Sequence, residues 1–232
     1  MSGLLFIISA PSGSGKSTLV NELLRVVPKL EFSVSYTTRP PRGSERDGHD
    51  YNFVTREQFE AMLAHGEFME HATVFGQHYY GTAKHYLEDA RIHGHDLLLD
   101  IDVQGASQVK TSHPEAISVF VLPPSRKVLE YRLRNRNEGA HGLMEDVIER
   151  RLKEASNEIK NYDRYDYILV NDILEESVEQ LKSIVVSHRA TADKHQLTSE
   201  EQRLQKIAES CLQATNKNDS RIKEIVNSFT AN

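Results

Sequence analysis

Residues 10–17, which read Ala-Pro-Ser-Gly-Ser-Gly-Lys-Ser, have the side chains and spacing of a loop that binds phosphate. Gly13 and Gly15 allow the backbone to curl so that successive N–H groups point inward at phosphate oxygens. Lys16 has the length to reach the β- and γ-phosphates of a nucleotide, and Ser17 offers a hydroxyl to Mg²⁺. The chemistry indicated by this segment is the binding of a nucleoside triphosphate with its metal ion.

The segment is a Walker A sequence in which Ala10 replaces the leading glycine. The alternative is a glycine-rich turn that binds nothing. Binding requires a strand before the loop and a helix after it, and both are predicted: residues 4–8 form an uninterrupted apolar run, and residues 16–27 carry apolar side chains at helical spacing. We therefore expect the phosphates of ATP to contact Ala10, Pro11, Ser12, Gly13, Ser14, Gly15, Lys16, Ser17 and Thr18.

Two acidic residues, Asp100 and Asp102, finish a second apolar run at residues 97–103. One interpretation is that they merely cap the end of a strand and bind no ligand. Acids that end a run of leucines are costly to bury without partners, however, which favours a binding site. Asp100 has the position of a Walker B carboxylate, which holds a water of the magnesium shell. We expect Mg²⁺ to be bound directly by Ser17 and through water by Asp100.

The elements that must position these residues follow from the apolar pattern. Strands are predicted at residues 4–8, 97–103, 117–122 and 167–170. Helices are predicted between them, at residues 83–93, 125–136 and 144–162. Buried strands that alternate with helices indicate an α/β domain with a mainly parallel sheet, which binds ligands beyond the carboxyl ends of its strands. Residues 31–81 are polar and rich in Arg, Tyr and Gly, and we interpret them as a small inserted subdomain.

Composition narrows the possible partners. The chain has 232 residues, a net charge of −6 and a sequence pI near 6.0, so nothing in its overall charge favours nucleic acid or an anionic membrane. Its single cysteine, Cys211, excludes an intramolecular disulfide and a thiolate-rich metal site. The first apolar run is too short for a signal sequence or a membrane span. We expect a cytoplasmic protein.

The end of the chain carries two further amphipathic stripes, at residues 199–213 and 220–229. They predict two helices appended to a complete core. Their apolar faces must be buried either in a homo-oligomer or against the same chain. The sequence leaves both possibilities open.

Several other motifs, taken in order, resemble the guanylate kinase family. They are residues 33–42 (SVSYTTRPPR), 48–53 (GHDYNF), 68–71 (FMEH), 79–82 (YYGT) and 99–105 (LDIDVQG). The resemblance extends from about Leu4 to about His188 and implies a P-loop NTPase-type parallel sheet flanked by helices. It implies a domain at 1–188, with a core at 1–32, 83–124 and 153–188, a GMP-binding insert at 33–82 and a helical lid at 125–152. Residues 189–232 are then a C-terminal helical extension.

The resemblance also implies which residues bind GMP. The phosphate would be held by Arg39, Arg42, Tyr51 and Tyr80, and the guanine read by Ser35, Glu70, Thr82 and Asp102. Arginine forks and phenolic hydroxyls suit a dianionic phosphate. A carboxylate accepts hydrogen bonds from guanine N1–H and the 2-amino group, whereas adenine offers a lone pair at N1 and no 2-amino group, so such a site discriminates between the two bases.

Arginines of the predicted lid complete the implied catalytic set. Arg132 and Arg136 are four residues apart and share one face of a helix. By the resemblance, these two and Arg151 close over ATP and neutralise the charge of the transferring phosphoryl group. A solvated basic helix face is the alternative. The implied catalytic residues are Lys16, Arg39, Arg132, Arg136 and Arg151.

The implied activity is transfer of the γ-phosphoryl group of Mg-ATP to GMP, giving GDP and ADP. A phosphate monoester has a second pKa of about 6, so the attacking oxygen needs no general base at neutral pH. Two rivals are a catalytically silent protein-interaction module of the same architecture and a kinase for another nucleoside monophosphate. The presence of Lys16 and Ser17 argues against the first, and Glu70 with Asp102 argues against the second.

Overall fold

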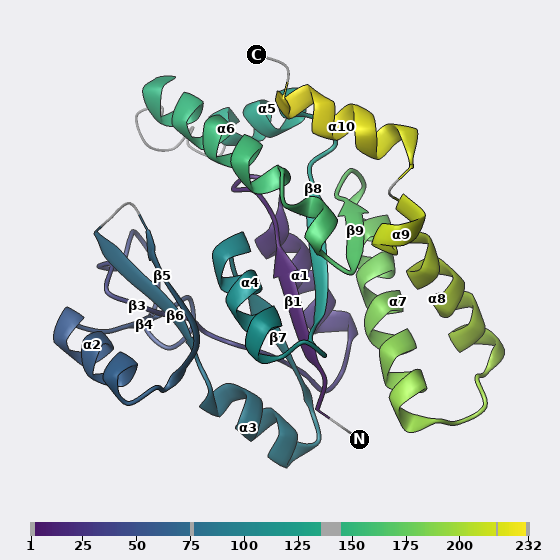
Figure 1. Ribbon diagram of the computed structural model, residues 1–232, viewed down its shortest axis with the longest axis horizontal. Helices are drawn as coiled ribbons and strands as arrows, with labels where there is room; N and C mark the ends of the chain where they lie inside the picture. Colours follow the sequence, from purple (N-terminus) through teal and green to yellow (C-terminus); the bar gives the residue numbers. More distant parts are fainter. Residues whose placement is uncertain (1–2, 75–76, 136–144, 217, 231–232) are drawn as a thin grey trace. The chain divides into compact units, whose positions relative to one another are not determined.

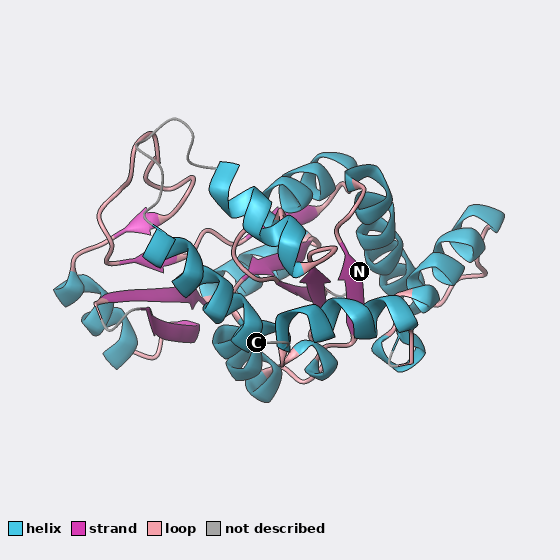
Figure 2. Ribbon diagram, turned by 90° about the horizontal axis from the view of Figure 1, so that it is seen from above, coloured by secondary structure: helices cyan, strands magenta, loops and turns pink. Residues whose placement is uncertain are grey.

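The computed structural model describes residues 3–74, 77–135, 145–216 and 218–230. Strands of its main sheet are β1 (Leu5–Ser9), β2 (Leu30–Phe32), β7 (Asp96–Asp100), β8 (Ile117–Leu122) and β9 (Tyr167–Val170). Their order is β2-β7-β1-β8-β9, and β2/β7 and β8/β9 pair in parallel. Helices alternate with these strands along the chain (Figures 1 and 2). The predicted α/β class, with a parallel sheet flanked by helices, is confirmed.

The chain divides into two compact units. It passes from the first unit to the second between Ile7 and Ile8, returns to the first at Lys29, and enters the second again at Ser118. The first unit contains Lys29–Ile117. Besides β2 and β7 it holds the helices α2 (Arg56–Ala64), α3 (His85–His93) and α4 (Val103–Ser112). Its second sheet has the order β4-β3-β6-β5, from β3 (Tyr36–Thr37), β4 (Asn52–Phe53), β5 (Phe68–Val74) and β6 (His78–Ala83). This small sheet has its own core, which includes Phe59, Phe68 and Ala83, and the insert at 33–82 stays a prediction.

The second unit contains Ile8–Pro28 and the chain from Ser118 onward. Its helices are α1 (Lys16–Val26), α5 (Arg126–Asn135), α6 (Glu145–Ile159), α7 (Leu174–Asp193), α8 (Ser199–Ser210), α9 (Gln213–Asn216) and α10 (Ser220–Thr230), with a short 3₁₀ turn at Tyr162–Arg164. Helix α7 packs against both α1 and α8. No described helix is both long enough and apolar enough to cross a membrane.

Several predicted element bounds shift, and two of these shifts lie beside expected site residues. The strand predicted over 97–103 ends at Asp100, and Val103 begins α4. The reason is that the Asp102 carboxylate accepts a 2.8 Å hydrogen bond from the Gly105 N–H and so caps a helix. The helix predicted from residue 83 begins at His85, because Ala83 still pairs with Phe68 in the small sheet.

The extension packs on its own chain. Apolar side chains of both stripes are buried, among them Leu204, Ala208, Ile222, Ile225 and Phe229. Helix α8 lies along α7, and α10 contacts α5 and α6 (Figure 1). Between these helices, the Cys211 carbonyl accepts a 2.8 Å hydrogen bond from the Ile168 N–H of β9. The extension is continuous with α7, which runs through the boundary placed at residue 188. Self-association through these helices stays a prediction. The reason for it was the apolar faces of the two helices, which in this structure pack against the same chain.

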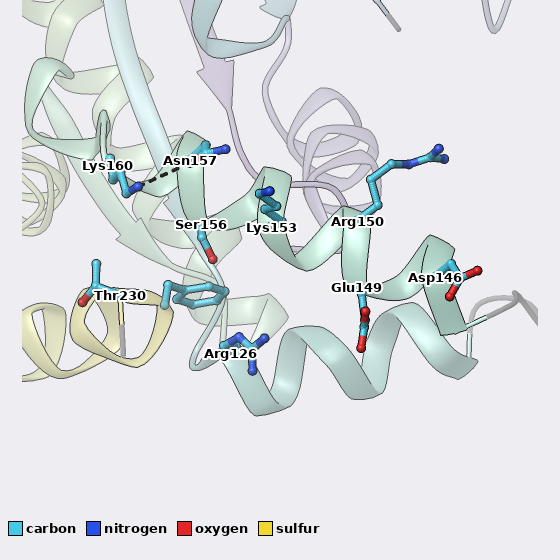
Figure 3. Close-up of a pocket in the computed structure, with 10 residues that line it drawn as sticks. Arg126, Asp146, Glu149, Arg150, Lys153, Ser156, Asn157, Lys160 and Thr230 are labelled. Carbon is cyan, nitrogen blue, oxygen red and sulfur yellow. Dashed lines mark hydrogen bonds between the residues drawn. The ribbon is translucent and has the colours of Figure 1, made fainter. Parts of the chain in front are cut away.

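Helix α10 also closes one side of a pocket of about 820 Å³ (Figure 3). Phe229 and Thr230 of α10 line it together with Arg126 and one face of α6. That face contributes cations and acids alike, Arg150 and Lys153 beside Asp146 and Glu149. None of the site residues expected from the sequence is among those that line this pocket, so the candidate site lies elsewhere.

Candidate active site

The glycine-rich loop has the backbone that phosphate binding requires. Gly13 and Gly15 have φ values of 92° and 85°, in the left-handed region that side chains with a Cβ rarely adopt. The N–H of Leu19 donates to the Gly15 carbonyl at 3.1 Å, which is the first turn of α1. The amides that precede it form the helix N-terminus, where partial positive charge gathers and anions bind. The strand-loop-helix arrangement predicted for residues 10–18 is confirmed.

The loop is fixed by hydrogen bonds from two residues far away in sequence. Asn171 Nδ2 donates to the Ser14 carbonyl oxygen at 2.7 Å. Arg132 donates to the same oxygen at 3.2 Å through Nη1 and to the Asn171 carbonyl at 3.1 Å through Nη2. A Cβ on Gly15 would lie 2.6 Å from Asn171 Nδ2, so this glycine is required by contact as well as by backbone. Sequence reasoning missed Asn171, although a polar residue directly after a buried strand was a usable signal.

The three arginines implied to form the lid differ in their location in the structure. Arg132 of α5 is half-buried and contacts the phosphate loop as described above. Arg151 lies half-buried in the middle of α6. Arg136 lies outside the described residues. Arg132 is therefore a lid arginine that the structure brings to the loop.

The residues implied to read guanine gather around Glu70 in the first unit. Glu70, on β5, is only 5% exposed, and its Oε1 accepts a 2.7 Å hydrogen bond from Thr82 Oγ1 on β6. Burial, with the negative charge of Asp102 as a smaller cause, raises the pKa of Glu70 to about 7, although the Thr82 hydrogen bonds act in the opposite direction. A buried carboxyl poised near neutrality, beside a second acid, is typical of a functional site.

The residues implied to hold the GMP phosphate surround Arg39. Its side chain is buried; Nη1 and Nη2 each donate to a Glu45 carboxylate oxygen at 2.9 Å, and Nε donates to the Tyr80 hydroxyl at 3.0 Å. The guanidinium also lies 5.2 Å from the centre of the Tyr51 ring. Glu45 accepts the Arg42 N–H at 2.8 Å as well, and the pKa of Glu45 is lowered chiefly by Arg39. Sequence reasoning missed Glu45, which orients this cationic group.

Three expected residues are placed less closely. Arg42 has an exposed side chain, as a residue that closes onto a ligand would. Ser35 is half-buried, and its carbonyl accepts the Asn52 N–H at 2.9 Å. Asp100 is half-buried at the carboxyl end of β7. The described residues contain no cluster of three or more His, Cys, Asp or Glu side chains able to hold a metal ion.

The loop between β1 and α1, ending in Lys16 and Ser17, places the chain in the class of P-loop nucleotide-binding proteins. The chain belongs to the guanylate kinase family, because the family model described as Guanylate kinase matches residues 2–188. A guanylate kinase of Koribacter versatilis is 56% identical over 229 residues, 99% of this chain and 97% of that protein. One of Alkalilimnicola ehrlichii is 45% identical over 87% of this chain and 94% of its own.

A solved structure agrees with this membership. The crystal structure of guanylate kinase from Anaplasma phagocytophilum superposes with a TM-score of 0.66 at 34% identity, covering 81% of this chain and 86% of that one. The Koribacter relative matches nearly the whole chain, whereas the Alkalilimnicola match covers 201 residues. The match to the Koribacter relative therefore includes the extension, which lies outside residues 2–188, the part that the family model matches.

Proposed function

We propose that this protein transfers the γ-phosphoryl group of Mg-ATP to GMP, producing ADP and GDP. A phosphate oxygen of GMP attacks the γ-phosphorus, and the bond between that phosphorus and the β,γ-bridging oxygen breaks as ADP leaves. The acceptor oxygen is already largely deprotonated at neutral pH, so the protein need not supply a base. Catalysis is then positioning and electrostatic stabilisation of an in-line transfer.

The observation that carries this proposal is the pairing of Glu70 with Thr82 in a buried site. The ionised carboxylate accepts from guanine N1–H and the 2-amino group, and Asp102 adds a second acceptor nearby. The Arg39 group, with Arg42, Tyr51 and Tyr80, supports binding of the GMP phosphate. By this division of roles, the proposed GMP site consists of residues of the insert 33–82 together with Asp102.

On the ATP side, backbone N–H groups within the loop 10–18 hold the phosphates, and Lys16 neutralises them. Arg132, Arg136 and Arg151 of the lid 125–152 stabilise the charge of the transferring group. Mg²⁺, bound by Ser17 and through water by Asp100, would draw electron density from the β- and γ-phosphates. The donor set fits this ion, because hydroxyl, carboxylate-held water and phosphate oxygens are the hard ligands that Mg²⁺ prefers. A cytoplasmic location stays a prediction.

The test is ADP release in the presence of ATP, Mg²⁺ and GMP, compared between wild type and Lys16→Ala. We expect GMP-dependent ADP release from the wild type, its loss on chelation of Mg²⁺, and its loss in Lys16→Ala. GMP should still raise the melting temperature of Lys16→Ala, because the GMP site does not use this lysine. An intact protein that binds GMP but releases no ADP would support the silent interaction module instead.

A further inference from the structure

Gly105 lies buried in the first turn of α4 between two carboxylates. Its N–H donates a 2.8 Å hydrogen bond to Asp102 Oδ1. A Cβ built on its Cα would lie 2.6 Å from Glu70 Oε2 and 3.1 Å from Glu70 Cδ. One residue thus contacts both of the acids assigned to guanine, one through its amide and the other through its lack of a side chain.

The backbone gives no reason for glycine here. Gly105 lies within the helix Val103–Ser112, a conformation that every residue except proline adopts, and alanine is the better helix former. The reason must be the space that Glu70 occupies. Helix α4 packs directly on β5, which carries Glu70, so a Cβ at position 105 has no open volume to enter.

The Glu70 carboxylate has little freedom to avoid such a Cβ. Its Oε1 is held by Thr82 Oγ1 at 2.7 Å, while its Oε2 faces Gly105. An added methyl group would force the carboxylate away from Thr82, or push α4 away from β5. Either change moves the acceptor oxygens out of register with a purine edge, and the second also moves Asp102.

We propose that Gly105 is a specificity-determining positioning residue, which sets the Glu70 and Asp102 carboxylates at the spacing that guanine requires. The proposal rests on the proposed function, since it assigns the two acids to GMP. It concerns the acceptor nucleotide alone, because Gly105 has no part in the phosphate loop.

The test is Gly105→Ala in the full-length chain, with KM measured separately for GMP and for ATP. We expect KM for GMP to rise roughly tenfold or more, because misplaced buried acceptors lose their partners, and KM for ATP to change by less than about twofold. Gln104→Ala, at the exposed neighbouring position, should leave both values unchanged. If the added Cβ is accommodated without displacing Glu70, the variant gains helix stability and keeps its KM for GMP, which would overturn the proposal.

A double variant tests the contact itself. Glu70→Asp removes one methylene group and withdraws the carboxylate from position 105. We therefore expect Gly105→Ala to raise KM for GMP much less in the Glu70→Asp background than in the wild type. The same factor in both backgrounds would refute a Glu70–Gly105 contact. If Gly105→Ala does not fold, we expect the double variant to fold, because the shorter Asp side chain relieves the clash. Failure of both variants to fold would also refute the Glu70–Gly105 contact.

Wild-type turnover separates this inference from the proposed function. If the wild type does not phosphorylate GMP, the proposed function fails. If it does, and Gly105→Ala keeps the wild-type KM for GMP, only the role of Gly105 fails.

Discussion

The side-chain amide of Asn171, at the end of β9, donates a 2.7 Å hydrogen bond to the backbone carbonyl oxygen of Ser14, from which it is separated by 157 positions in the sequence. Both residues are buried, and Arg132 contacts the same carbonyl. Because two donors hold the Ser14 carbonyl, and the Ser14 N–H donates to the Pro11 carbonyl at 3.0 Å, the backbone of the loop is fixed before any nucleotide arrives. Such preorganisation is what an electrostatic catalyst requires.

Replacing Asn171 with Ala should therefore impair the use of ATP. Loss of this donor leaves a buried carbonyl with Arg132 as its remaining partner, at a cost of about 0.5–1.5 kcal/mol, or roughly a 2- to 12-fold fall in kcat/KM for ATP. KM for GMP should change far less. Steady-state kinetics with each nucleotide varied in turn provides the measurement. Asn157→Ala, at an exposed site on α6, is the matched control, and an equal loss for both nucleotides would count against a role in the loop.

GMP binding should depend on the ionisation of Glu70. Burial raises the pKa of this carboxyl to about 7, and only the ionised form accepts from guanine N1–H and the 2-amino group. KM for GMP should thus fall as pH rises toward 7 and level off above it. In Glu70→Gln this step should disappear, leaving only the step near pH 6 from the GMP phosphate itself. Identical pH profiles for the two proteins would exclude Glu70 as the titrating group.

The same shift predicts a pH dependence of stability. Between its ordinary pKa near 4.5 and about 7, Glu70 is more protonated in the folded than in the unfolded protein. Stability from this group is therefore full below about pH 4.5 and declines as pH rises through about 7, by at most roughly 3 kcal/mol. Urea unfolding of wild type and Glu70→Gln across this range isolates the contribution. A difference between the two that is constant with pH would contradict the raised pKa.

The Arg39–Glu45 pair should stabilise the ligand-free protein. Glu45→Gln keeps the shape but removes the charge facing a buried guanidinium, and should lower the free energy of unfolding by about 1 kcal/mol, since Glu45 is partly exposed. Because Arg39 lowers the pKa of Glu45, this contribution is present at neutral pH and is lost on acidification below the ordinary carboxyl range.

Ligand binding supplies the control for this variant. The dianionic phosphate of GMP should replace the missing charge, so GMP should raise the melting temperature of Glu45→Gln more than that of the wild type. Glu60→Gln, which removes the partner of Arg56 in an exposed ion pair, should leave both the stability and the GMP effect unchanged. An equal effect of GMP on wild type and Glu45→Gln would show that the phosphate does not reach Arg39.

Phe229 should anchor the C-terminal extension to the lid helices. It is 5% exposed on α10, which contacts α5 and α6. Phe229→Ala should cost about 3–5 kcal/mol of unfolding free energy in urea titrations, as for other buried phenylalanines. Thr230→Ala, exposed at the next position, should cost little. A change below about 1 kcal/mol for Phe229→Ala would mean that α10 is not part of the cooperative unit.

Much of the fold follows from local patterns. The strands at 117–122 and 167–170 were predicted with their correct bounds, because uninterrupted apolar runs next to turn residues have one stable environment, a sheet covered on both faces. The end of the strand before Asp102 was predicted wrongly, because a helix that begins directly after a strand continues the apolar run without a break. The two helices of the extension pack against α5, α6 and α7. This packing depends on the complementary surfaces of those helices, which a local sequence pattern does not predict.

The candidate site divides in the same way. The positions of Lys16, Ser17 and the glycines depend on local geometry, so they could be predicted from their spacing in the sequence. The partners that orient the site were missed, since Asn171 acts on a carbonyl 157 residues away and Gly105 acts through a side chain it lacks. Even Glu45, six residues from Arg39, resembles any other exposed acid until the chain folds.

The most direct test of the account is the ratio of kcat/KM for GMP to that for AMP, at saturating Mg-ATP and pH 8, where Glu70 is ionised. Two carboxylates that accept from N1–H and the 2-amino group predict a preference for GMP of roughly thousandfold or more. That preference should collapse in Glu70→Gln. Comparable turnover of GMP and AMP by the wild type, or no turnover of GMP, would contradict the proposed function.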